Sequence, residues 1–129
     1  MAYLRPGFFM RRVMNPLVQA FKVKPTLAVK GRNSGKWRTV PVNVLEHDGQ
    51  RYLVAIRGEC EWVRNLRTAG SGEIRQGEKV ERFTGTEVPV GDRESIIAAY
   101  RSVWEREVAS IFSKLPDAAD HPVFRIEYR

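Results

Sequence analysis

The residues best suited to ligand chemistry lie in one short segment, from Lys30 to Arg38. Gly31 and Gly35 bracket a turn there, and Asn33 and Ser34 add short polar side chains. The cations in and beside the turn are Lys30, Arg32, Lys36 and Arg38. Backbone amides in such a turn and the positive charges around it can together hold a phosphate. The spacing is not that of a P-loop, and the same segment would also serve as an ordinary hairpin turn.

A second segment, from Arg57 to Arg67, combines a helical pattern with one unexplained polar residue. Trp62 and Leu66 are one helical turn apart, which predicts a short helix over 61–68 that packs them against a core. A helix this short is not stable alone, so we expect Trp62 to be its largest buried anchor. Asn65 has no role in that pattern, and nothing in the helical spacing explains it.

The sequence offers few groups for acid–base or metal chemistry. His47 falls at an expected hairpin tip and His121 precedes a proline, and neither is near a serine or cysteine nucleophile. Cys60 is the only cysteine, so no internal disulfide can form. No cluster of His, Cys, Asp and Glu has metal-ligand spacing, and we expect no metal site. An enzyme of this kind would take its chemistry from a bound organic cofactor.

Positive charge is concentrated at the start of the chain. The net charge is +7, and the first acidic residue is Glu46. The charged residues before it are all basic: Arg5, Arg11, Arg12, Lys22, Lys24, Lys30, Arg32, Lys36 and Arg38. This asymmetry favours an anionic partner, either nucleic acid, a membrane surface or a phosphorylated small molecule, although a solvated basic face would look the same. Trp37 is the only aromatic in the basic loop, so we expect no nucleic acid partner.

Hydrophobic periodicity and turn residues predict an α+β or small-barrel fold with mostly antiparallel strands. Asp48-Gly49 predicts a hairpin turn, Pro41 an edge strand or a bulge, and Asp92 the N-cap of the last helix. The expected strands are 26–30, 37–45, 51–57, 73–76, 79–89 and 123–128, and the expected helices are 8–21, 61–68 and 92–112. The segment 8–21 is expected as one amphipathic helix or as two short ones with Pro16 at the start of the second.

The length predicts a single domain, 1–129, in which residues 1–24 form an N-terminal helical segment. There is no apolar run of about 18 residues and no signal-peptide core, so a cytoplasmic protein is expected. Phe8, Phe9, Arg11 and Arg12 leave three roles open for the first helix. It could pack on the barrel, contact a partner, or rest on anionic lipid at the inner face of the membrane. Packing on the barrel is favoured, because the phenylalanines alternate poorly with the charges.

Four pieces of the chain together resemble the deazaflavin-dependent nitroreductase family of actinobacteria. They are Gly31-Arg32-Asn33-Ser34-Gly35-Lys36-Trp37-Arg38-Thr39-Val40-Pro41-Val42, then Asp48-Gly49, then Tyr52-Leu53-Val54-Ala55, then Trp62-Val63-Arg64-Asn65-Leu66. The resemblance implies a split β-barrel like that of FMN-binding proteins, mostly antiparallel. It also implies an N-terminal helix, a short helix after the third strand and a longer C-terminal helix. The implied cofactor is coenzyme F420, a deazaflavin with a phosphate and an oligoglutamate tail.

The resemblance also assigns roles to residues. It places the phosphate and tail at Arg32, Asn33, Ser34, Lys36 and Arg38. It places the deazaflavin ring beside Val40, Pro41 and Val42, with Ala55, Ile56 and Arg57 at the other edge of the ring. Trp62 and Asn65 match the family's Trp-x-x-Asn-Leu signature, which also belongs to the cofactor site.

The activity that the resemblance implies is hydride transfer from the reduced deazaflavin to an electron-poor small molecule, namely a quinone, an enone or a nitro compound. Tyr100 and Arg57 are the candidates for polarising this electron acceptor. Two other readings stay open: a deazaflavin-binding or carrier protein without turnover, and, ranked last, a nucleic-acid-binding barrel. Both a monomer and a homodimer are compatible with the sequence.

Overall fold

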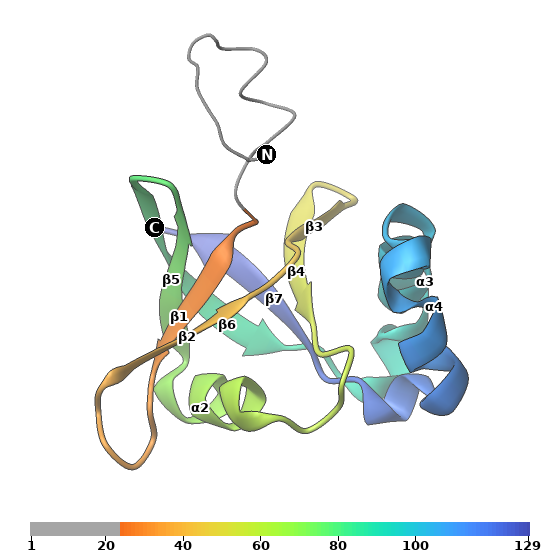
Figure 1. The fold of residues 1–129 in the computed structure, drawn as a ribbon, viewed down its shortest axis with the longest axis horizontal. Helices are drawn as coiled ribbons and strands as arrows, with labels where there is room; N and C mark the ends of the chain where they lie inside the picture. Colours follow the sequence, from red (N-terminus) through yellow and green to blue (C-terminus); the bar gives the residue numbers. More distant parts are fainter. Residues whose placement is uncertain (1–23) are drawn as a thin grey trace, which may run out of the picture.

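The computed structural model describes residues 24–129, so the helix expected over 8–21 lies outside the described residues. Within them, seven strands form one antiparallel sheet in the order β2-β1-β5-β6-β7-β4-β3 (Figure 1). The strands are β1 Thr26–Lys30, β2 Trp37–Pro41, β3 Leu45–His47, β4 Gln50–Val54, β5 Ser71–Gln76, β6 Lys79–Glu87 and β7 Val123–Tyr128. The helices are α2 Glu61–Ala69, α3 Glu94–Val103 and α4 Glu105–Lys114, with short 3-10 helices at Val90–Asp92 and Ala118–Asp120.

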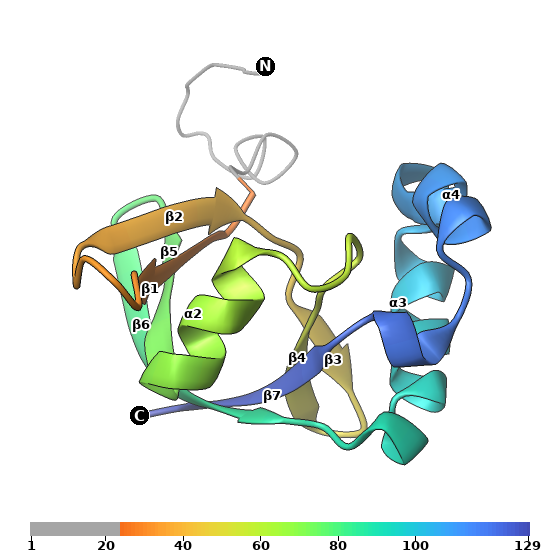
Figure 2. The same ribbon diagram turned by 90° about the horizontal axis from the view of Figure 1, so that it is seen from below.

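The sheet curls around α2 and carries α3 and α4 on its other side (Figures 1 and 2). Successive residues of a strand pack into two different hydrophobic cores, because side chains alternate between the two faces of a strand. On β4, Leu53 joins the core around α2, whereas Val54 joins the core around α3 and α4. On β7, Phe124 and Val123 divide in the same way. Among residues 24–129, no helix is long and apolar enough to span a membrane.

The β3–β4 hairpin forms where the sequence predicts it. Asp48 and Gly49 have φ angles of 52° and 74°, which suits the tight turn that matches the twist of the flanking strands. The strands pair Leu45 with Tyr52 and His47 with Gln50. This turn fixes the position of β4, whose far end leads into the candidate site.

The expected strand over 37–45 is broken in two, which corrects the sequence-based boundaries. β2 ends at Pro41, and residues 42–44 leave the sheet before β3 begins. Val42 donates its amide to the carbonyl oxygen of Pro25 at 2.9 Å, so the chain crosses the start of β1 at this point. β2 is an edge strand, as Pro41 predicts. β4 ends at Val54, and the short helix therefore follows the fourth strand and not the third.

The single helix expected over 92–112 is also wrong. Asp92 lies in a 3-10 helix, and α3 and α4 are separated at Trp104, whose φ and ψ are −117° and 35°. The Trp104 ring packs on Tyr100 at 4.6 Å between centroids. The break allows residues of both helices to enter one core, including Ile97 from α3 and Phe112 from α4. An unbroken helix of this length could not follow the curved sheet at both ends.

The short helix α2 forms as expected but is rotated relative to the prediction. Its fully buried residues are Val63 and Leu66, and Asn65 is 5% exposed. Trp62 is only half-buried and packs against the edge of the core, with its ring 5.9 Å from that of Phe124. Val63 therefore takes the anchoring position expected for Trp62, and Trp62 is turned toward the candidate site.

Candidate functional site

The loop between β1 and β2 closes on itself through hydrogen bonds. The Gly31 amide donates to the Lys36 carbonyl oxygen at 2.8 Å, and the Gly35 amide donates to the Gly31 carbonyl oxygen at 2.9 Å. Lys36 donates its own amide to Ser34 Oγ at 3.2 Å. Gly35 has a φ of 71°, a conformation that favours glycine. These amides are not free to hold a phosphate as expected, so side chains must provide most of the charge and donors.

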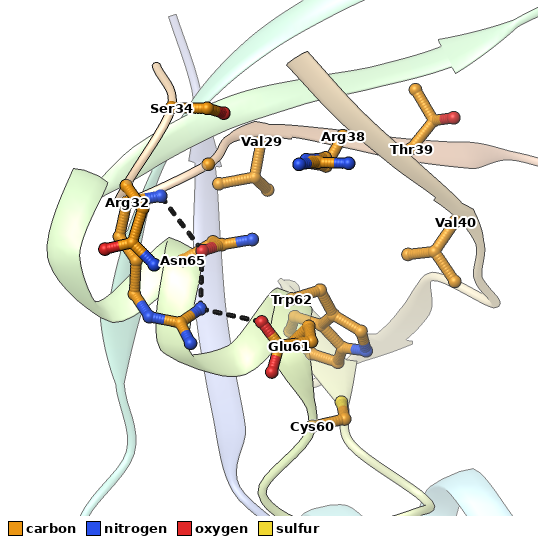
Figure 3. A pocket seen from close by; sticks show the side chains of 12 residues that line it. Val29, Arg32, Ser34, Arg38, Thr39, Val40, Cys60, Glu61, Trp62 and Asn65 are labelled. Atoms are coloured by element: carbon orange, nitrogen blue, oxygen red, sulfur yellow. Dashed lines mark hydrogen bonds and ion pairs between the residues drawn. The ribbon is translucent and has the colours of Figure 1, made fainter. Parts of the chain in front are cut away.

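Asn65 on α2 holds the other side of this loop. Its Oδ1 accepts two hydrogen bonds from Arg32, one from the amide at 3.1 Å and one from Nη1 at 2.8 Å. The same Nη1 donates to Glu61 Oε1 at 3.0 Å, and this hydrogen bond lowers the pKa of Glu61 below its ordinary value. Figure 3 shows the amide nitrogen of Asn65 turned toward the cavity. Asn65 therefore positions the loop and keeps a donor for a ligand, while Arg32 is partly neutralised.

Arg38 and Lys36 are the loop cations whose charge stays available. Within residues 24–129, neither side chain forms an ion pair or a hydrogen bond with another residue. Arg38 lies on β2 and lines a cavity beneath the loop, next to Ser34. A Cβ atom at Gly31 would lie 3.0 Å from Ser34 Oγ and 3.5 Å from Arg38 Nε, so the glycine lets both side chains lie close to the backbone.

The cavity beneath the loop has a volume of about 580 Å³ and combines an apolar wall with a polar rim. Val29, Val40 and Trp62 form the wall, and Cys60 lies at the end where α2 begins (Figure 3). The polar lining consists of Arg32, Asn33, Ser34, Arg38, Thr39, Glu61 and Asn65. A flat ring system fits the wall, and an anionic group fits the rim at Arg38.

A smaller cavity of about 210 Å³ adjoins the first, and the two share Val40, Cys60 and Trp62 in their linings. Its other lining residues are Lys24, Pro41, Val42, Asn43, Val54, Ile56, Arg57, Tyr100 and Glu107. The structure thus brings together two groups of residues that the sequence predicts, one on β2 and one after β4. Tyr100 from α3 joins them, although it is far from both in the sequence.

Four polar residues line one side of the smaller cavity and are hydrogen-bonded in a chain. Asn43 Nδ2 donates to Tyr100 Oη at 3.0 Å and to Glu107 Oε2 at 2.9 Å. Lys24 Nζ contacts the same carboxylate oxygen at 2.7 Å and lowers the pKa of Glu107. Burial raises the pKa of Tyr100, which is only 3% exposed, and the nearby charge of Glu107 adds to this effect. Tyr100 is therefore held neutral beside an ionised carboxylate.

Some predicted site residues lie outside both cavity linings. Lys36 stands on the exposed loop, and Ala55 is buried with its carbonyl oxygen 2.9 Å from His121 Nδ1. His121 is fully buried and its other ring nitrogen faces the Leu115 carbonyl oxygen at 2.6 Å, so this histidine connects β4 to the end of α4. No group of three or more metal-ligating side chains occurs within the described residues.

Sequence reasoning missed several lining residues. In the larger cavity these are Val29, Thr39, Cys60 and Glu61, and in the smaller one Lys24, Asn43, Val54 and Glu107. Asn43 had a signal that could have found it, since it is the one polar residue in the apolar run from Val40 to Leu45. Glu107 had none, because it lies on a helix among other exposed charged residues.

A model of the F420H2-dependent quinone reductase family matches residues 8–113, most of the chain. The chain belongs to this family. The expected F420H2-dependent oxidoreductase activity, with coenzyme F420 as the cofactor and a small molecule as the substrate, is thereby confirmed. No curated protein sequence matches the chain.

Solved structures support the same assignment. An F420H2-dependent reductase, FDR-A, is 25% identical, with a TM-score of 0.58 over 80% of this chain and 93% of that chain. A structure described as a domain-swapped dimer is 24% identical, with a TM-score of 0.58 over 80% of this chain and 78% of that one. The heme storage protein HutZ from Vibrio cholerae is 16% identical, with a TM-score of 0.55 over 93% and 92%. The curled sheet is thus the split β-barrel fold that the resemblance implies.

The donor set of the larger cavity fits the cofactor of this family. F420 carries a flat ring and a strongly acidic tail, and the cavity offers an apolar wall at Val40 and Trp62 with an unneutralised Arg38 at its rim. Among the loop residues that the resemblance assigns to the phosphate and tail, Arg32, Asn33, Ser34 and Arg38 line the cavity, whereas Lys36 lies on the exposed loop beside it.

Proposed function

We propose that F420 binds in the larger cavity, with its phosphate and tail at Arg32, Asn33, Ser34, Lys36 and Arg38. The observation that carries this assignment is the juxtaposition of an unneutralised Arg38 with the apolar wall at Val40 and Trp62 in one cavity of about 580 Å³. Charge-assisted hydrogen bonds from arginine suit a phosphate group, and apolar side chains suit the ring. Asn65 supports the loop and directs its amide nitrogen at the ligand.

When bound, reduced F420 supplies a hydride to an electron-poor small molecule. The protein's own residues bind both partners, exclude water between them and stabilise negative charge that develops on the electron acceptor. Tyr100 and Arg57 are the groups that would polarise it, because both line the cavity next to the cofactor site. A quinone, an enone or a nitro compound has the required chemistry. Pro41, Val42 and Ile56, which the resemblance places beside the deazaflavin ring, line the cavity next to it and would give both the edge of the ring and the electron acceptor an apolar surface.

A side-by-side titration with F420, FMN and FAD tests the cofactor assignment. We expect F420 to bind most tightly, because the basic loop complements its acidic tail, and tighter binding of FMN would contradict the proposal. Turnover is then measured with reduced F420 and menadione. Tight F420 binding without reduction of menadione, an enone or a nitro compound would favour the carrier reading instead.

We further propose that residues 1–129 act as one domain in the cytoplasm, with the N-terminal segment packed on the barrel. A homodimer is supported by the domain-swapped dimer found among the similar structures. Light scattering of the full chain distinguishes a dimer from a monomer. Flotation with anionic vesicles tests contact of the N-terminal helix with the inner face of the membrane, and sedimentation of all the protein away from the vesicles would exclude it.

A further inference from the structure

We propose that the smaller cavity is the binding site of the electron acceptor, and that Asn43 is a positioning residue that leaves the Tyr100 hydroxyl proton free to donate to an oxygen of that molecule. The proposal rests on the proposed function, since it takes the larger cavity as the cofactor site. It adds a role for Asn43, which no sequence motif marks, and a reason why the Tyr100 hydroxyl proton points to the ligand.

The two cavities adjoin, which places two ligands side by side. They share Val40, Cys60 and Trp62, so a molecule in one touches the same side chains as a molecule in the other. A volume of about 210 Å³ is below the roughly 300–1,000 Å³ typical of drug-sized ligands, so the smaller cavity suits a compact ring compound. Its apolar lining fits the body of such a compound, and its polar side, at Tyr100 and Asn43, fits an oxygen atom.

The direction of the hydrogen bond between Asn43 and Tyr100 follows from Glu107. Lys24 keeps Glu107 ionised, and an ionised carboxylate can only accept hydrogen bonds. Asn43 must therefore turn its NH2 group toward Glu107, and the same nitrogen lies 3.0 Å from Tyr100 Oη. The tyrosine oxygen accepts this bond. Within the described residues nothing accepts the hydroxyl proton of Tyr100, which lines the cavity.

Tyr100 acts here as a hydrogen-bond donor and does not transfer its proton. Its pKa is raised by burial, so the hydroxyl stays protonated at neutral pH. Reduction adds a hydride, meaning two electrons and a proton, to the electron acceptor, and the π electrons of its C=O bond move to the oxygen. Tyr100 stabilises the negative charge on this oxygen, and water supplies the second proton. The other titratable groups that line the cavity are Lys24, Arg57, Cys60 and Glu107.

Asn43→Asp reverses the hydrogen bond that the proposal depends on. The new carboxyl group lies against Glu107 and shares one proton with it. Its oxygen then accepts the Tyr100 proton and turns it away from the cavity, whereas Tyr100→Phe removes the proton altogether. With reduced F420 and duroquinone, we expect each variant to lower kcat about a hundredfold to a thousandfold, as for loss of a donor to a developing oxyanion. The double variant should lose no more than the worse single variant, because Asn43 acts through Tyr100.

The controls separate this role from a structural one. Tyr128→Phe removes a hydroxyl from a half-buried tyrosine that does not line the smaller cavity, and its kcat should stay unchanged. The Kd of both variants for F420 should match the wild type, and both should unfold in one cooperative transition, with the Tm of Asn43→Asp lowered by its contact with Glu107. The proposal is overturned if Tyr100→Phe binds F420 normally and keeps its kcat within about twofold, or if the two substitutions have additive effects.

A second test needs no cofactor and no turnover. Cys60 is the only thiol in the chain and lies between the cavities, so its alkylation by N-ethylmaleimide reports ligand binding. Duroquinone suits this test because all four of its ring carbons that a thiol could attack carry methyl groups. We expect duroquinone to slow the alkylation of Cys60 in the wild type. If it does not, the proposal fails.

Two substitutions then assign the protection to one cavity. Val42→Phe fills only the smaller cavity and should abolish protection by duroquinone, whereas Thr39→Phe narrows only the larger one and should leave it intact. The opposite pattern would place the electron acceptor in the larger cavity and overturn the proposal. Failure of the wild type to bind F420 would instead contradict the proposed function, and the duroquinone result could still be read.

Discussion

The two cavities share a wall but differ in how their polar groups are paired. At the rim of the larger cavity, Arg38 has no partner within the described residues, and the neighbouring loop lies exposed. At the side of the smaller cavity, Asn43, Tyr100 and Glu107 are connected by hydrogen bonds of 2.9–3.0 Å. The larger cavity therefore offers a positive charge that an anionic ligand can neutralise. The smaller cavity offers one oriented hydrogen-bond donor, and the polar groups around that donor are already hydrogen-bonded.

This difference suggests what each region contributes. Unpaired cations on an exposed loop attract an acidic molecule and contribute affinity that salt will weaken. A buried, hydrogen-bonded group changes little when a ligand arrives, so it can orient a reacting molecule without reorganising. Substitutions at the larger cavity should therefore alter binding first, and substitutions at the smaller one should alter the rate first.

The largest effect should come from the helix beneath the shared wall. Leu66→Ala removes a fully buried side chain and should lower the free energy of unfolding by about 2–5 kcal/mol. Trp62→Ala should cost less stability, because Trp62 is half-buried, but it should weaken F420 binding and slow reduction together. Urea unfolding and F420 titration measure the two effects. Equal destabilisation by the two substitutions would show that Trp62 is mainly a core residue.

Arg38→Ala tests the unpaired charge of the larger cavity. Loss of a charge-assisted contact costs about 1.5–3 kcal/mol, so the Kd for F420 should rise about tenfold to a hundredfold. Arg125→Ala is the matched control, because this arginine lies on β7, is absent from the linings of both cavities and forms one weak ion pair, 3.9 Å from Glu127. Increasing salt should weaken F420 binding more in the wild type than in Arg38→Ala. Equal Kd changes in the two folded variants would count against the assignment.

Asn65→Ala tests whether the loop must be held in place. Removing Oδ1 leaves the Arg32 amide without its acceptor and the guanidinium with Glu61 alone, and should cost about 1 kcal/mol of stability. We expect a rise of about fivefold to tenfold in the Kd for F420, of the size given by one hydrogen bond. Asn65→Asp keeps the acceptor for Arg32 but removes the donor, so it should preserve stability while still weakening F420 binding. Unchanged F420 binding in both variants would exclude Asn65 from the site.

The smallest effect should come from Glu107 at the smaller cavity, and it should appear in the free energy of unfolding at acidic pH. The pKa of Glu107 lies below its ordinary value of 4.5 in the folded protein, so its ionisation stabilises the fold above that pH. This contribution is lost as the pH falls through the folded-state pKa, and Glu107→Gln should therefore show a smaller loss of unfolding free energy between about pH 7 and about pH 3.5. Glu105→Gln, at an exposed glutamate without an ion pair among residues 24–129, is the control. Parallel pH curves for Glu107→Gln and the wild type would contradict this reasoning.

The parts of the site that could be predicted are those with local signals. The Gly31–Gly35 turn, the Asp48-Gly49 hairpin and the helix that begins at Glu61 depend on residues close in the sequence, and each forms at the expected place. The resemblance to a deazaflavin-dependent family rests on the same segments. These signals did not show which face of α2 is buried. Val63, and not Trp62, faces the core, because the fit of α2 into the curved sheet decides which side of the helix is buried.

The smaller cavity could not be predicted, because it depends on contacts between distant segments. Asn43 meets Tyr100 and Glu107 across 57 and 64 residues of sequence. The break at Trp104 brings α4 back toward the sheet, yet the apolar pattern continues through it without a proline or glycine. Residues of both helices pack in one core with strand residues that are distant in the sequence, and such contacts have no signature within the helix itself.

The two outer strands of the sheet affect whether copies of this protein aggregate at high concentration. Within the described residues, β2 and β3 are the outer strands, and an outer strand with free backbone groups can recruit a strand from another molecule. β2 carries Pro41, which cannot donate a hydrogen bond, and β3 is only three residues long and contains the charged Glu46. Both edges are poor templates for strand addition. The chain should therefore resist fibril growth along these edges.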